Sequence, residues 1–172
     1  MHFPLFIELE GRPCLVVGGG PVAVRKAQAL AECGAKVKTV APEACGRSFE
    51  DADVEGMTLV VSATNDRAVN RHVAELCKAR GVPVNVVDDP ENCTFIFPAV
   101  VRKGPMTVAV SSGGACPVAA KLVRDRVARS LPDDFVAAVE RLGNERENLK
   151  RNYPDPQVRR RVCEEALKRW KD

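Results

Sequence analysis

Apolar positions in the first half of the chain follow two alternating patterns. Short apolar runs that end at glycine or polar residues predict buried strands, and they lie at 13–17, 36–42, 57–64 and 82–88. Apolar residues three or four positions apart predict helices between them, one over 22–33 ended by Gly34 and one around 69–77 ended by Gly81. Strands that alternate with helices at this spacing predict β-α-β units and a parallel sheet, hence the α/β class.

After Asp88 this alternation ends. The stretch FIFPAVVRKGPMTVAVSS, residues 95–112, predicts two extended segments joined by a turn at Lys103, Gly104 and Pro105. Such a ribbon has exposed edges unless something covers it, and a second subunit is one such cover.

From Pro117 onward the pattern is helical. Asp155 followed by Pro156 predicts the start of a last helix, with an N-cap and a proline in the first turn. The apolar residues recur on one face of each helix: Val118, Leu122 and Val127; Phe135, Val139 and Leu142; Val158, Val162, Ala166 and Trp170. These patterns divide the chain into an α/β domain over 1–90, an extended dimerisation segment over 91–116 and a small helical tail over 117–172.

Three consecutive glycines, Gly18, Gly19 and Gly20, stand between the first predicted strand and the first predicted helix in CLVVGGGPVAVRKAQAL, residues 14–30. With Ala23 they satisfy G-x-G-x-x-A, in which the first glycine makes a tight turn and the second admits a diphosphate. The small third residue lets the helix pack close to the sheet, and the start of the helix attracts phosphate. Glycine-rich turns also serve packing alone, but this context predicts a dinucleotide-binding, Rossmann-like sheet.

An acidic side chain about 20 positions further on holds the ribose hydroxyls in such domains. The second predicted strand ends just before Glu43, which is the nearest candidate. Arg47 lies close by, so a 2′-phosphate is left open, and NAD is preferred to NADP.

The segment SATND, residues 62–66, follows a later strand at the carboxyl edge of the sheet, where ligands of open α/β sheets bind. Thr64 and Asn65 are therefore candidate cofactor contacts. The alternative is that one of them only caps the following helix.

Composition and charge narrow the class of protein. The 172 residues are 45% hydrophobic and carry a net charge of +3 in scattered lysines and arginines, which disfavours a nucleic-acid partner and suits an acidic small molecule. No apolar run approaches the roughly 20 residues of a membrane span. Glu8 and Glu10 near the start are untypical of a signal peptide, so we expect a soluble, cytoplasmic protein.

The seven cysteines are odd in number and form no CxxC pair, and only two histidines accompany them. This disfavours a disulfide framework and a bound metal, and we expect buried, reduced thiols.

Four stretches of the chain resemble motifs of one protein family, and they follow one another in the same order as in that family. They are FPLFIELEGRPCLVVGGGPVAVRKAQALAECGAKVKTVAPE, SATNDRAVNRHVAELCKARGVPVNVVDDPENCTFIFPAVV, RKGPMTVAVSSGG and CPVAAKLVRDRV. Together they are similar to the precorrin-2 dehydrogenase / sirohydrochlorin ferrochelatase family, which includes the amino-terminal module of siroheme synthase. The resemblance covers roughly residues 3 to 130.

The resemblance implies NAD-dependent oxidation of precorrin-2 to sirohydrochlorin on the path to siroheme. Some members also insert ferrous iron, so Fe2+ is expected as a substrate and not as a held cofactor. The resemblance further implies a homodimer in which the extended region is exchanged between subunits.

The resemblance also assigns residues. Its important carboxylate is the aspartate that ends N-V-V-D, which is Asp88 here, and a carboxylate at that place can take the ring proton that is lost as conjugation extends. Asp before proline is also ordinary turn chemistry, and Asp89 is a close competitor. The cofactor contacts that it implies fall on Pro21, Val22, Pro42 and Glu43.

The acetate and propionate groups at the edge of precorrin-2 call for cations and hydrogen-bond donors. SSGG, which is Ser111, Ser112, Gly113 and Gly114, lies before the helix at Pro117 and can form an anion-binding turn or serve only as a flexible link. Arg124 is our preferred partner for a substrate carboxylate, and Arg102, Lys103 and Lys121 are further candidates, although each is more often a solvated surface charge.

The chain departs from the family in three places. Only EACGRS, residues 43–48, stands where the family has a helix and another strand, which predicts a shortened or lost strand. Cys116 replaces a common serine, and the helical tail is short. Two other functions stay open: a nucleotide-sensing regulatory module without catalysis, and a dehydrogenase of another acidic substrate.

Overall fold

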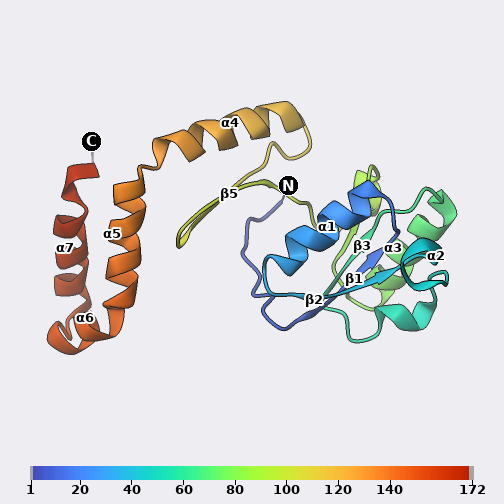
Figure 1. The fold of residues 1–172 in the computed structure, drawn as a ribbon, viewed down its shortest axis with the longest axis horizontal. Coiled ribbons are helices and arrows are strands. Elements are labelled where there is room, and N and C mark those ends of the chain that lie inside the picture. The colour runs from blue at the N-terminus through green and yellow to red at the C-terminus, as the bar shows by residue number, and fades with distance from the viewer. Residues whose placement is uncertain (1, 171–172) are drawn as a thin grey trace. The chain divides into compact units, whose positions relative to one another are not determined.

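The computed structural model describes residues 2–170, and the chain forms two compact units, Met1–Ile96 and Phe97–Asp172. Figure 1 shows the first unit in blue to green and the second in yellow to red. The units divide a few residues after the predicted boundary at 90, because the segment after β4 (Val84–Val86) still bonds to that strand.

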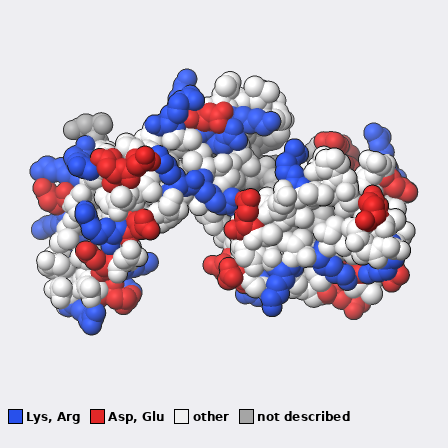
Figure 2. All heavy atoms as spheres, in the orientation of Figure 1, with Lys and Arg blue, Asp and Glu red and all other residues white. Residues whose placement is uncertain are grey.

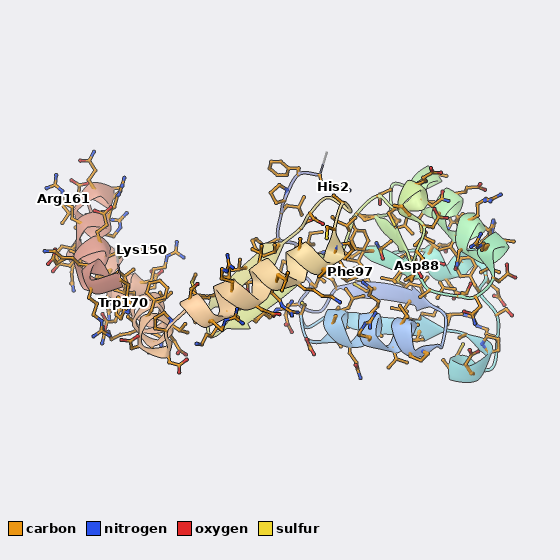
Figure 3. The ribbon with its side chains drawn as sticks, turned by 90° about the horizontal axis from the view of Figure 1, so that it is seen from above. His2, Asp88, Phe97, Lys150, Arg161 and Trp170 are labelled. Atoms are coloured by element: carbon orange, nitrogen blue, oxygen red, sulfur yellow. The ribbon has the colours of Figure 1, made fainter. Side chains whose placement is uncertain are left out.

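The first unit is a parallel sheet with helices on both faces, as predicted. Its strands are β1 (Pro13–Val17), β2 (Lys36–Val40), β3 (Leu59–Ser62) and β4, in the order β2-β1-β3-β4. Helix α1 (Pro21–Ala31) and helix α3 (Arg67–Ala79) cover opposite faces (Figure 3). The order reverses between β1 and β3, which makes a Rossmann-like sheet with a switch point at the carboxyl ends of these two strands.

Helices on both faces explain why the sheet strands are apolar runs. Leu15 and Val60, in the two central strands, are completely buried. From α3, Val73 and Cys77 pack against the sheet, as the helical spacing predicted. Burial raises the pKa of the Cys77 thiol to about 11.

The link between β2 and β3 is short. It contains helix α2 (Pro42–Cys45) and the 3-10 turn η1 (Asp51–Val54), and the described chain has no strand there, which agrees with the predicted loss. Buried Asp53 fastens this link: its carboxylate accepts from Arg47 at 2.6 and 2.8 Å and from Lys38 at 2.8 Å. The Arg47 guanidinium holds the pKa of Asp53 well below its usual range.

After β4 the chain forms the 3-10 turn η2 (Pro90–Asn92) and returns along the outer edge of β4. Thr94 N donates to Val84 O at 2.8 Å, and Val84 N donates to Thr94 Oγ1 at 2.7 Å. The edge of β4 is therefore covered, whereas β2 is an edge strand of the sheet.

The second unit is the predicted hairpin and helical tail. Strands β5 (Ala99–Lys103) and β6 (Met106–Val110) are antiparallel, and the turn between them contains Gly104 with a φ of 52°. The helices are α4 (Pro117–Ser130), α5 (Asp133–Asn144), α6 (Arg146–Asn152) and α7 (Pro156–Ala166), followed by the turn η3 (Lys168–Trp170). No sequence pattern predicted α6.

Two details of the tail test the predictions. Asp155 Oδ1 accepts from Gln157 N at 2.8 Å, which confirms the predicted N-cap of α7. On α4, however, Val118 and Leu122 are each 64% exposed, so this face is not covered within the chain.

The cysteines are less buried than we expected. All seven are free, but only Cys14 and Cys77 are buried, while Cys45 and Cys116 are exposed.

None of the helices within residues 2–170 combines the length and apolar character that a bilayer span requires. Figure 2 shows acidic and basic side chains interspersed on the visible face of each unit.

Candidate functional site

Two cavities adjoin each other at the carboxyl ends of β1 and β3, with volumes of about 650 and 550 Å³. Both are lined by Gly20 and by the segment 63–65, so they meet at the switch point of the sheet. We name them the β2-side cavity, which extends over the end of β2 to Phe49 and His72, and the Asp88 cavity, which extends between α3 and the loop 87–89. Ligands of open α/β sheets bind at this place.

The three glycines of the turn have different requirements. A Cβ on Gly18, whose φ is 122°, would lie 2.4 Å from the carbonyl oxygen of Ala63, and one on Gly19 would lie 2.5 Å from Glu43 Cγ. Gly18 and Gly19 therefore serve contacts within the protein. A Cβ on Gly20 would meet nothing within 4 Å, and its φ of −72° is open to any residue. The side chain missing at Gly20 leaves space for a group outside the chain.

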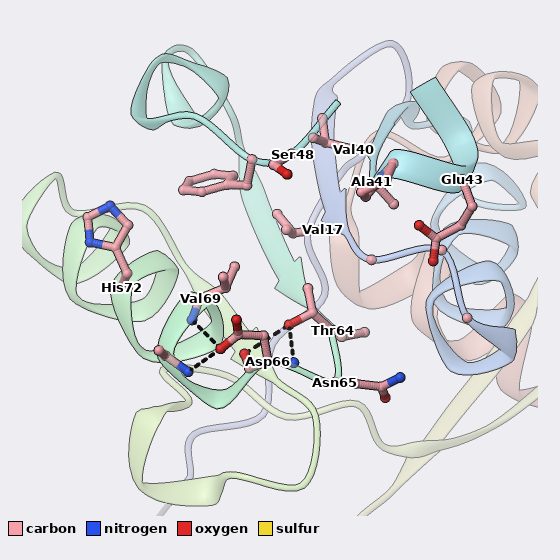
Figure 4. A pocket seen from close by; sticks show the side chains of 17 residues that line it. Val17, Val40, Ala41, Glu43, Ser48, Thr64, Asn65, Asp66, Val69 and His72 are labelled. Carbon is pink, nitrogen blue, oxygen red and sulfur yellow. Dashed lines mark hydrogen bonds between the residues drawn. The ribbon is translucent and has the colours of Figure 1, made fainter. Parts of the chain in front are cut away.

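The helices that begin at the two cavities have different N-termini. Asp66 caps α3, because its Oδ1 accepts from Ala68 N at 2.8 Å and from Val69 N at 3.2 Å (Figure 4). Helix α1 begins at Pro21, after Gly20 as its N-cap residue, without a side-chain cap and without an acidic residue in its first turn. Its first N–H groups are thus left for water or an anionic ligand.

The predicted capping by Thr64 or Asn65 is wrong, since Asp66 performs it. The Thr64 hydroxyl instead accepts from Asp66 N at 3.1 Å. Both Thr64 and Asn65 line the two cavities, where the sequence placed them as cofactor contacts.

Asn70 on α3 fixes the segment between the cavities. Its Oδ1 accepts from Ser62 Oγ at 2.8 Å and from Thr64 N at 3.2 Å, and its Nδ2 donates to Thr64 O at 3.0 Å. Sequence reasoning missed this residue, although an asparagine on the inner face of a predicted helix was a signal for it.

The cofactor contacts that the family resemblance implies line the two adjoining cavities. Pro21 and Val22 line the Asp88 cavity, while Pro42 and Glu43 line the β2-side cavity, where Figure 4 shows the Glu43 carboxylate. Ala23 is completely buried, as close packing of α1 on the sheet requires.

Because of Arg47, the sequence left open whether the cofactor carries a 2′-phosphate, as NADP does. Both terminal nitrogens of Arg47 bond to the Asp53 carboxylate, so this guanidinium is engaged within the protein. It does not line either cavity.

Asp88 is exposed in its cavity and has a φ of 58°, the one positive value at a non-glycine residue within residues 2–170 (Figure 3). The Cys93 thiol closes the loop around it. Val86 N donates to the sulfur at 3.2 Å, and the sulfur lies 3.2 Å from the carbonyl oxygens of Val86 and Asp89. The loop thus holds the backbone of Asp88 in a left-handed conformation that aspartate tolerates better than most residues do.

The residues predicted for substrate binding lie in the second unit. Ser111 Oγ accepts from Gly113 N and Ser112 Oγ accepts from Cys116 N, both at 3.0 Å, so these hydroxyls order the turn before α4. Gly113 and Gly114 have positive φ values of 64° and 89°, which glycine adopts readily. Arg124 bonds to neighbouring Asp125 through Nε at 2.8 Å. Within residues 2–170 no group of three or more His, Cys, Asp or Glu side chains is arranged to hold a metal ion.

Comparisons with known proteins identify the family of the chain and its fold. Residues 5–99 match a family described as putative NAD(P)-binding, and residues 103–130 match the central region of sirohaem biosynthesis proteins. The chain is 43% identical to the siroheme synthase of Thioalkalivibrio sulfidiphilus (strain HL-EbGR7), over 96% of this chain and 37% of that protein. For the siroheme synthase of Ectopseudomonas mendocina (strain ymp) the values are 41%, 95% and 38%.

The chain therefore spans less than two fifths of the length of these relatives. A solved structure of SirC, a precorrin-2 dehydrogenase, matches with a TM-score of 0.77 and 23% identity, over 96% of this chain and 89% of that chain. This match confirms the Rossmann-like fold with its helical tail.

Proposed function

Because this chain belongs to the putative NAD(P)-binding family and is homologous to siroheme synthases, we propose that it oxidises precorrin-2 to sirohydrochlorin with NAD. One observation carries the proposal. The uncapped start of α1 faces open space at Gly20, beside a cavity that contains the carboxylate of Asp88. The first feature suits a diphosphate, and the second suits a reaction that releases a proton.

The residues present fit NAD. The start of α1 would hold the diphosphate over Gly20, and Glu43 in α2, just after β2, would accept from the ribose hydroxyls. Phe49 and His72 supply further walls of the β2-side cavity. Engagement of Arg47 by Asp53 favours NAD over NADP, because it leaves that guanidinium without a role toward a 2′-phosphate.

When bound, NAD supplies the acceptor for a hydride. In this proposal the Asp88 carboxylate accepts the ring proton, and the loop closed by Cys93 keeps that carboxylate toward the cavity. The segment 62–65, fixed by Asn70, forms a shared wall of the two cavities and would contact both the cofactor and the substrate.

Iron insertion is the second reaction of this proposal, with Fe2+ and sirohydrochlorin as substrates. The same carboxylate can take the two pyrrole protons that the metal displaces, one after the other, and pass each to water. It lies in an open cavity, where an ion can enter and leave.

We also propose a cytoplasmic homodimer. The exposed face of α4 supports it, since Val118, Leu122 and Val123 are 64%, 64% and 48% exposed. Phe3 and Phe6 near the amino terminus are 84% and 75% exposed. In each unit, exposed large apolar side chains of this kind are typical of a surface that a partner covers.

The test is to mix the purified protein with precorrin-2 and NAD, follow the absorption spectrum, and then add Fe2+. We expect oxidation that requires NAD, followed by a separate metallation spectrum. The test variant for the cofactor site is Gly20→Val, whose side chain would occupy the open space at the start of α1. It should weaken NAD binding about 10-fold or more, measured by titration, because the diphosphate could no longer approach the backbone closely.

The outcomes separate the competing functions. Binding of NAD without oxidation of precorrin-2 would point to the nucleotide-sensing module. Oxidation of another acidic compound alone would point to a different dehydrogenase. Unchanged NAD affinity in Gly20→Val would contradict the assignment of the diphosphate.

A further inference from the structure

Two arginines on α3 line the Asp88 cavity. Arg67 is the first residue of the helix, and Arg71 follows one turn later on the same side. Within residues 2–170 no ion pair joins either guanidinium to a carboxylate. Two like charges at this spacing repel each other, and an anion bound between these exposed side chains would relieve that repulsion.

The nearby carboxylates do not neutralise this wall. Asp66 is engaged in capping α3, and Asp89 Oδ2 accepts from Asn92 Nδ2 at 2.8 Å. Glu75, one turn beyond Arg71, forms no ion pair with it in the described chain. The Asp88 cavity therefore has a cationic wall on α3 and an acidic wall on the loop 87–89.

We propose that Arg67 and Arg71 form a carboxylate-binding subsite for the substrate. This inference rests on the proposed function, because precorrin-2 carries acidic side chains around a ring that must also reach Asp88. Guanidinium groups bind carboxylates through paired, charge-assisted hydrogen bonds. An acidic substituent held on α3 would place the reacting ring against the opposite wall.

The diphosphate of NAD is the competing anion. The start of α1 at Gly20 already provides its site, with free N–H groups and no side chain in the way. Arg67 and Arg71 project from α3 and line the Asp88 cavity alone, whereas Gly20 lies at the start of α1 and lines both cavities. The tetrapyrrole is thus the better match for the pair.

The experiment compares the wild type with the double variant Arg67→Ala/Arg71→Ala. We expect KM for precorrin-2 to rise about 10-fold or more, with kcat at saturation within about 3-fold and the dissociation constant of NAD within about 2-fold. Arg67→Lys/Arg71→Lys keeps the charges but not the forked geometry and should restore part of the affinity. Fluorescence titration with sirohydrochlorin measures the same subsite without turnover.

Arg12→Ala is the matched control, because Arg12 is an exposed arginine of the same unit that precedes β1 at the opposite edge of the sheet. It should leave KM, kcat and the dissociation constant of NAD unchanged, and thermal unfolding checks that each variant folds.

A wild type that does not oxidise precorrin-2 refutes the proposed function and, with it, a subsite for this substrate. An active wild type with an unchanged KM in the double variant refutes this inference alone. A matching loss of NAD affinity assigns the arginines to the diphosphate and also overturns it.

Discussion

At the scale of single residues, Asp88 combines a carboxylate with an unusual backbone conformation. Asparagine adopts a φ near 58° about as readily as aspartate, so Asp88→Asn removes the charge and keeps the loop. We expect NAD affinity and thermal stability to be retained while turnover of precorrin-2 falls about 100-fold or more. Steady-state kinetics with Asp89→Asn as the control measure this. Unchanged rates of oxidation and metallation would remove Asp88 from the mechanism.

The position of Asp88 was predictable, but its conformation was not. The end of an apolar strand placed the carboxylate at the ligand-binding edge. The loop that holds this left-handed residue is closed by the Cys93 thiol, which bonds to Val86 and Asp89 on either side of Asp88. Sequence periodicity carries no signal for such a closure. Asn70 differs, because a polar residue on the inner face of a predicted helix is visible in the sequence.

At the scale of elements, the link between β2 and β3 is held by one buried charge. Asp53→Asn removes the partner of Lys38 and Arg47 and should lower the free energy of unfolding by about 2 kcal/mol at neutral pH. Because its pKa is lowered in the folded state, this stabilisation is present above the unfolded pKa of about 4 and declines as the pH falls below it. The difference between wild type and variant should therefore narrow at acidic pH.

Denaturant unfolding at neutral and acidic pH checks this dependence. Glu55→Gln is the control, since Glu55 pairs with Arg80 at 3.9 Å but its side chain is 71% exposed. A difference for Asp53→Asn that stays constant with pH would contradict the role of the carboxylate.

The regular elements were predictable where one physical signal dominated. Apolar runs before Gly18 and after Gly56 predicted strands whose side chains are buried on both faces of the sheet. The cap of α3 was predicted one or two residues early, because Thr64, Asn65 and Asp66 are all good capping residues. Their choice depends on Asn70, which engages Thr64 and leaves Asp66 to cap the helix.

At the scale of the whole molecule, the exposed face of α4 predicts assembly. We expect the wild type to be the proposed dimer and Leu122→Lys to be a monomer in light scattering coupled to size-exclusion chromatography, because burying a charge there without a partner is costly. Val24→Lys on α1 is the control, since Val24 is 48% exposed and lies on another helix. A dimer that withstands Leu122→Lys would place the interface elsewhere.

The edge position of β2 has a consequence for solubility. An unpaired strand edge is a template on which other chains can add and form fibrils. The edge of β4 is closed by Thr94, whereas β2 carries Lys36 and Lys38 at alternate positions. Charged lysines on an edge strand oppose such pairing, so these two side chains are expected to protect the exposed edge of β2 against the addition of a foreign strand.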